Sequence, residues 1–194
     1  MQRSVRRVLG VGVVLGMLGT AFSGSALGAV VGTSPIPTYQ ANGRVSVISW
    51  ATHEPYTVID LDVDANGVLV AGGGNGGNFA SLDPLTGARQ WIGGTDGNVQ
   101  AIAVVGGVVY AGGHWANYCG QTSGAHTCPH PTPRPKLLAV DESSGALLPW
   151  NPGANSSLGV FALAGDAVTG NLFAGGDFTT IGSRSQQHYA EFTP

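Results

Sequence analysis

Four side chains with oxygen donors lie at alternate positions early in the chain, and together they could hold a calcium ion. They are Asp60, Asp62, Asp64 and Asn66. The run matches the first half of a calcium-binding loop, in which carboxylate and carbonyl oxygens surround the ion. The bidentate acid expected at the twelfth position is replaced by Gly73. The same run fits a hairpin in which Ile59, Leu61 and Val63 face the core and the aspartates face water, and the sequence favours this alternative.

Two cysteines lie among histidines in a proline-rich stretch, and two kinds of bond are open to them. In an exported protein, Cys119 and Cys128 would form a disulfide. This bond would offset about 2–3 kcal/mol of the entropy of ordering the loop. The alternative is zinc held by both sulfurs and two of His114, His126 and His130, because zinc accepts tetrahedral nitrogen and sulfur ligands. The spacing follows no standard zinc pattern, so the sequence favours the disulfide.

The sequence contains no group of residues typical of catalysis. Gly72, Gly74 and Gly77 match the letters of a dinucleotide-binding motif, but no helix is predicted after them to bind a phosphate. No Gly-x-Ser-x-Gly motif marks a nucleophile, and His53 and His188 stand alone. We therefore assign no catalytic and no cofactor-binding residue, and besides the zinc alternative above only calcium is left open as a cofactor.

The segments that would position these residues form a repeat of about three copies. The strand-length segments are 58–63, 68–73 and 79–83 in the first copy, 99–105, 108–113 and 139–141 in the second, and 160–164, 171–176 and 189–194 in the third. Ala-Gly-Gly ends the second strand of each copy, at residues 71–73, 111–113 and 174–176. One antiparallel unit cannot bury both its faces, so the copies must stack. The sequence therefore predicts an all-β fold.

A tryptophan and a glycine turn recur with the strands. These positions are Asp83, Gly87 and Trp91 in the first copy, Asp141, Gly145 and Trp150 in the second, and Trp50 before the first. The pattern resembles the tryptophan-docking repeat of pyrroloquinoline-quinone (PQQ)-like β-propellers, including the secreted delta-60-type repeats of actinobacteria. The resemblance implies a partial β-propeller of about three four-stranded antiparallel blades. Each tryptophan would pack on the neighbouring blade, with its indole N–H bound to a backbone carbonyl.

Closed propellers need about four to eight blades, which is more than this chain supplies. Three explanations stay open: a fragment of a longer protein, several copies that complete a ring, or an arc with open edges. A homo-oligomer is therefore one expected state of the chain.

The N-terminus is typical of a bacterial export signal. A basic start is followed by an uncharged stretch that ends in small residues near Ala29, although an uncleaved membrane anchor would look similar. We predict a signal helix over 1–29, a linker over 30–42 and the repeat domain over 43–194. Cleavage would leave five basic and eleven acidic residues, a net charge of −6. This charge argues against a nucleic-acid partner, and loss of the leader argues against stable membrane insertion.

The predicted function is a secreted, noncatalytic module that binds or scaffolds a protein or carbohydrate. The alternatives are a calcium-stabilised cell-surface adhesion module and a fragment of a PQQ-type quinoprotein oxidoreductase. We expect the binding surface on the insertion in the second copy, residues 115–136, because loops on a rigid scaffold commonly carry recognition. There the cysteine pair would expose Trp115, Tyr118 and His130. A solvated loop without a partner is the alternative.

Overall fold

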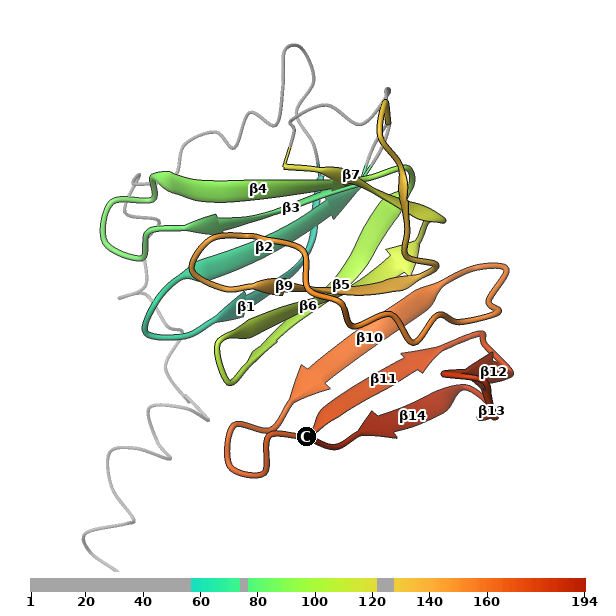
Figure 1. Cartoon of the computed structure of the whole chain (residues 1–194). Coiled ribbons are helices and arrows are strands. Elements are labelled where there is room, and N and C mark those ends of the chain that lie inside the picture. The colour runs from blue at the N-terminus through green and yellow to red at the C-terminus, as the bar shows by residue number, and fades with distance from the viewer. Residues whose placement is uncertain (1–56, 74–76, 122–127) are drawn as a thin grey trace, which may run out of the picture. The chain divides into compact units, whose positions relative to one another are not determined.

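The computed structural model describes residues 57–73, 77–121 and 128–194, which fall within the compact unit Gly43–Pro194. The predicted signal helix, the linker and the strand at Trp50 lie outside these residues. Within the described part, every regular element is a β-strand and every strand pairing is antiparallel (Figure 1). The all-β prediction is confirmed for this part of the chain.

The first sheet is built by four consecutive strands and is extended by two strands from the insertion. The consecutive strands are β1 (Thr57–Val63), β2 (Val68–Gly73), β3 (Gly77–Leu82) and β4 (Arg89–Thr95). Next to β4 lie β7 (Asn117–Gly120) and β8 (Thr132–Pro133). The insertion, which we predicted as a loop, therefore adds to the sheet of the preceding copy.

The second sheet contains three strands, β5 (Asn98–Val105), β6 (Val108–His114) and β9 (Leu137–Asp141). The predicted fourth strand ending at Trp150 is reduced to one bridge between Val140 and Leu147. The N–H of Leu148 still donates to Ala139 O at 2.9 Å, but Pro149 follows and has no N–H to donate. The ladder therefore ends before the tryptophan.

The third sheet also contains three strands, β10 (Val160–Gly165), β11 (Leu172–Gly176) and β14 (Tyr189–Phe192). A small hairpin of β12 (Thr180–Ile181) and β13 (Arg184–Ser185) lies between β11 and β14 in the sequence. The described sheets thus have six, three and three strands besides this hairpin, so the predicted four-stranded unit is seen complete only in the first copy.

The three sheets share one register, which the strand pairing makes visible. Each has a bulge near the start of its first strand, directly after one pair, and these pairs are Val58 with Gly72, Val99 with Gly113, and Val160 with Gly176. The register therefore matches Gly72 to Gly113, one residue earlier than the sequence alignment of the Ala-Gly-Gly segments. The common bulge shows that the copies repeat in backbone geometry as well as in sequence.

The core lies between successive sheets. One buried cluster joins Leu69, Phe79 and Trp91 of the first sheet to residues of the second, and another joins Leu137 to Val160 and its neighbours in the third. In agreement with this, β5 packs against β1 and β2, and β10 packs against β5 and β6. Each described sheet buries a face by stacking on its neighbour.

Candidate functional site

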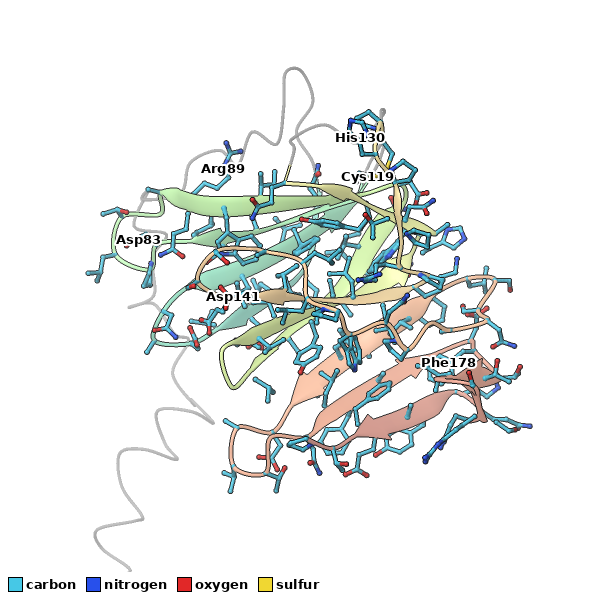
Figure 2. The ribbon with its side chains drawn as sticks, viewed as in Figure 1. Asp83, Arg89, Cys119, His130, Asp141 and Phe178 are labelled. Carbon is cyan, nitrogen blue, oxygen red and sulfur yellow. A yellow bond between two sulfur atoms is a disulfide. The ribbon has the colours of Figure 1, made fainter. Side chains whose placement is uncertain are left out.

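The recurring aspartates hold tight turns. Oδ1 of Asp83 accepts hydrogen bonds from the N–H of Leu85 at 3.0 Å, and from the N–H and hydroxyl of Thr86 at 2.7 and 2.8 Å (Figure 2). The bond from the Thr86 hydroxyl, with those from the backbone, lowers the pKa of Asp83. Gly87 closes the turn with a φ of 72°, a conformation that favours glycine. This carboxylate is occupied in holding the backbone.

The second copy repeats this turn around Asp141. Its Oδ1 accepts bonds from the N–H and hydroxyl of Ser144 at 2.9 and 2.6 Å, and the Ser144 side chain is the largest influence lowering the pKa of Asp141. Gly145, with a φ of 68°, donates to Asp141 O at 2.8 Å. Serine therefore replaces threonine without loss of the turn.

A third turn of the same kind lies at Asp166, a residue that the sequence analysis missed. Asp166 accepts bonds from the N–H of Val168 at 2.8 Å and the hydroxyl of Thr169 at 2.6 Å, and Gly170 has a φ of 79°. The signal was available, because Asp166 to Gly170 repeats the Asp-x-x-Thr-Gly pattern of Asp83. It was missed because the turn joins the first two strands of its copy, whereas the others follow the third strand.

Trp91 links the first sheet to the Asp141 turn of the second. Its indole N–H donates to Glu142 O at 2.6 Å, and the side chain is only 7% exposed. The backbone of Gly145 lies against the ring, because a Cβ added there would be 2.7 Å from Cδ2 of Trp91. A tryptophan from one copy thus packs on the glycine turn of the next.

Trp150 has different surroundings. It is half-buried between Tyr110 and Phe192, with ring centroids 5.1 and 5.2 Å away and both contacts edge-on. It packs on β14 of the third sheet, whereas Trp91 packs on a turn. Trp50 lies outside the described residues. The two described tryptophans therefore share a place in the repeat but have unlike neighbours.

The residues considered for calcium do not converge on one point. Oδ2 of Asp60 accepts the N–H of Ile102 at 2.9 Å, and Oδ2 of Asp62 accepts the N–H of Val104 at 2.8 Å. Asp64 instead binds its own turn, through bonds to Oδ1 from the N–H groups of Asn66 at 2.7 Å and Gly67 at 2.9 Å. In the described ranges, no group of three or more His, Cys, Asp or Glu residues could hold a metal ion.

The expectation that the aspartates face water and the apolar residues of β1 face the core was wrong. Ile59, Leu61 and Val63 are 47%, 58% and 54% exposed. The aspartates point instead to β5, where the backbone N–H groups need acceptors between the stacked sheets. Asp60 and Asp62 therefore join the first sheet to the second.

Replacing Asp60 or Asp62 by alanine is expected to destabilise the chain by about 1–3 kcal/mol each, since a charge-assisted bond is lost and an N–H loses its acceptor. Urea unfolding measures the effect. Asp62→Asn is the control, because the amide oxygen can still accept the bond, and it should lose less than Asp62→Ala. Equal stability of Asp62→Ala and the wild type would contradict the role, and a midpoint that falls on chelation would show a bound ion.

Two carboxyl groups, Asp64 of the first sheet's hairpin and Glu142 after β9 of the second sheet, also meet between these sheets. Glu142 is only 6% exposed, and its side chain is hydrogen bonded to that of Asp64. Burial, the bond to Asp64 and the charges of Asp64 and Asp141 raise the pKa of Glu142. Sequence analysis missed this pair, and the two residues share no motif that could have joined them.

Glu142→Gln is expected to raise the melting temperature at pH 7. Because the pKa of Glu142 is raised in the folded chain, its favourable contribution is present at low pH and is lost as the pH rises through that pKa. The gain should therefore disappear below the ordinary glutamate pKa of 4.5. Melting curves recorded between about pH 3 and 8, a range that includes the titration of carboxyl groups, measure this gain in melting temperature. Exposed Glu191→Gln is the control, and a gain independent of pH would contradict the assignment.

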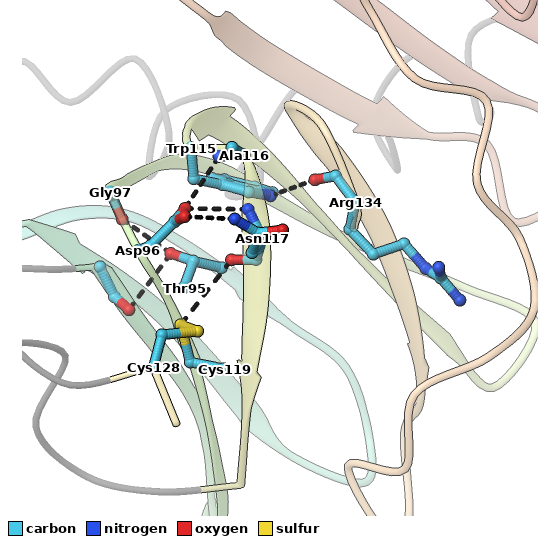
Figure 3. The surroundings of a disulfide bond; sticks show 10 residues. Thr95, Asp96, Gly97, Trp115, Ala116, Asn117, Cys119, Cys128 and Arg134 are labelled. Atoms are coloured by element: carbon cyan, nitrogen blue, oxygen red, sulfur yellow. Dashed lines mark hydrogen bonds between the residues drawn. A yellow bond between two sulfur atoms is a disulfide. The ribbon is translucent and has the colours of Figure 1, made fainter. Parts of the chain in front are cut away.

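The insertion is closed by the predicted disulfide between Cys119 and Cys128 (Figure 3). The bond confirms the pairing and leaves neither thiol free to bind zinc. Asp96 holds the base of the insertion, because it accepts the N–H groups of Ala116 and Asn117 at 2.8 and 2.9 Å and the Asn117 side-chain amide at 2.7 Å. The disulfide is compatible with an extracellular or periplasmic protein.

Two of the three residues proposed for recognition on the insertion are buried, so the expectation that all three are exposed was wrong. Trp115 is 3% exposed and donates its indole N–H to Arg134 O at 2.6 Å. Tyr118 is 5% exposed, lies 6.5 Å from the ring of Phe79, and has its pKa raised to about 12 by burial. The rings fill the core between the sheets, and only His130 is exposed.

A groove lies along the outer edge of β14. It has a volume of about 460 Å³, and its lining includes Trp150, Ile181, Arg184, Gln186, Glu191 and Phe192. In the first sheet the corresponding strand β3 is paired with β4 on this side, whereas no described strand pairs with the outer edge of β14 (Figure 1). Among the described strands, none occupies the backbone groups of this edge, which an added strand could pair with.

No helix in the part of the chain that the structure describes is long and apolar enough to cross a membrane.

No family model and no curated protein matches the chain. Among solved structures, the chain is similar to the crystal structure of BamB from Moraxella catarrhalis, with 15% sequence identity and a TM-score of 0.24. The match covers 69% of this chain and 56% of that chain, so this chain spans little more than half of its length.

Proposed function

We propose that the chain is an exported, noncatalytic binding module made of propeller-type blades, and that it takes an extended protein segment along β14. The repeated register and the stacking of the sheets support the propeller type. The described carboxylates of the repeats support a noncatalytic role, because they bind backbone N–H groups of turns and neighbouring strands.

The outer edge of β14 beside the groove, with which no described strand pairs, is the observation that carries this proposal. An extended peptide can add to such an edge through main-chain hydrogen bonds, while neighbouring pockets select its side chains. Trp150 and Phe192 supply apolar surface, and Arg184 and Glu191 supply charges of both signs. These features suit a peptide better than a carbohydrate, which has no row of amide groups to pair with a strand.

The test uses a synthetic peptide with the sequence of residues 88–95, which includes β4, the strand that occupies this place in the first sheet. Added to the isotope-labelled chain, it should shift the amide resonances of Tyr189 and Glu191, whose N–H groups lie on the side of β14 away from β11, and slow their hydrogen exchange. The matched control is the same peptide with alternate backbone nitrogens methylated, which cannot pair with a strand. Equal shifts with both peptides, or no shift with either, would overturn the proposal.

A further inference from the structure

The two interfaces between the sheets are built from register-equivalent residues. In the second interface, Val160 and Leu163 of β10 pack on Gly112 of the second sheet: a Cβ added to Gly112 would lie 2.9 Å from Cγ1 of Val160 and 3.3 Å from Cδ1 of Leu163. The register places Val99 and Ile102 of β5 at the same positions, and they lie in the first interface at 0% and 2% exposure.

The first sheet carries the same positions without a described neighbour. They are Val58 and Leu61 of β1, which are 41% and 58% exposed, followed on the same face by Val63 at 54%. We call Val58, Leu61 and Val63 the leading face. The equivalent apolar side chains are buried in the second sheet, and in the third sheet Val160 is buried and Leu163 partly buried, whereas those of the first sheet are exposed. Exposure of this kind is typical of a surface that packs against another protein.

The third sheet presents the complementary surface at the other end of the series. Gly175 is the register equivalent of Gly112, but a Cβ added there would meet only Ala162 and His188 among the described residues, at 3.8 and 3.9 Å. Beside it, Phe173 stacks on Tyr189 with ring centroids 6.5 Å apart, and Tyr189 is 54% exposed. We call Phe173, Gly175 and Tyr189 the trailing face.

We propose that a second copy of this chain places its leading face on this trailing face, and so continues the stack of sheets from one molecule to the next. Leu61 of one copy then packs on Gly175 of the other, as Leu163 packs on Gly112 within the chain. The interface continues one that the chain already makes twice, and this repetition is what selects a second copy as the occupant. Because the two faces differ, the contact is head-to-tail. This inference does not depend on the proposed peptide groove.

The experiment measures the mass of the exported form by sedimentation equilibrium between about 1 and 100 μM, a range that detects micromolar association. The wild type is expected to form particles of two or more chains. Leu61→Glu and Tyr189→Glu should each weaken this association by at least about tenfold, because each places a charge in an apolar contact. Leu85→Glu is the matched control, since Leu85 is 73% exposed and lies away from both faces in the Asp83 turn, and it should associate as the wild type does.

Mixing the two impaired variants distinguishes the proposed head-to-tail contact from other modes of dimerisation. The Leu61→Glu chain keeps an intact trailing face, and the Tyr189→Glu chain keeps an intact leading face, so the mixture should form one-to-one pairs and nothing larger. A monomeric wild type at the highest concentration, an equal loss with Leu85→Glu, or a mixture without pairs would each overturn the inference. Circular dichroism of every variant checks that the sheets are retained.

Discussion

Trp91→Ala destabilises the chain by about 3–5 kcal/mol, the range expected when a large aromatic side chain is removed from a core. Three losses contribute. The ring leaves a cavity between the first and second sheets, its edge-on contact with Phe79 at 5.9 Å disappears, and the buried Glu142 O loses its hydrogen-bond donor. Urea unfolding followed by circular dichroism measures the change.

Two further variants identify which of these losses matters. Trp91→Phe keeps an aromatic ring but removes the indole N–H, so it should lose about 1–3 kcal/mol. Trp150→Ala should lose less than Trp91→Ala, because Trp150 is half-buried and packs on rings rather than on the glycine turn. A loss at Trp150 equal to or above that at Trp91 would contradict the difference that we describe between them.

Gly145→Ala is expected to destabilise the chain by about 2–5 kcal/mol. The φ of 68° at this residue lies in the left-handed region, and an alanine held there costs about 1–2 kcal/mol of stability. The added Cβ would also lie 2.7 Å from Cδ2 of Trp91 and 2.8 Å from Nε2 of Gln121, and overpacking of this kind costs about 1–3 kcal/mol. Thermal and urea unfolding both report the loss.

Gly106→Ala separates the two contributions. Gly106 has a similar φ of 59°, but a Cβ there would meet no atom within 4 Å, so only the backbone term remains. The double variant Trp91→Ala with Gly145→Ala should lose less than the sum of the single variants, because removal of the ring also removes the clash. Strict additivity would show that the ring and the turn do not act together.

The strands and turns could be predicted from the sequence because their signals are local. The apolar run over β5 and the Gly-Gly turn before β6 define a hairpin within one short segment. The pairing of Tyr118 with Thr95 could not be predicted in this way, because it joins an insertion to the preceding copy and is directed by the burial of Tyr118 beside Phe79. Pro149 was a local signal that we did not use, and it explains the missing fourth strand of the second sheet.

The candidate site was predictable in composition but not in orientation. A period of two shows that Asp60 and Leu61 lie on opposite faces of β1, yet it cannot say which face a neighbouring sheet will cover. In stacked sheets both faces can be buried, so an alternating polar residue is no longer a sign of solvent. The exposure predicted for Trp115 was wrong for a related reason. Its indole N–H binds the carbonyl of Arg134, a residue distant in the sequence, and no local pattern indicates this contact.

The pairing of β7 with β4 has a mechanical consequence. Residues encoded between β6 and β9 of the second sheet form hydrogen bonds with the first, so the second sheet cannot be pulled away as a separate slab until those bonds are broken. Among the described strands, none from the third copy pairs with the second sheet in this way. Under a stretching force applied across the stack, the chain should therefore yield between its second and third sheets before it yields between its first and second.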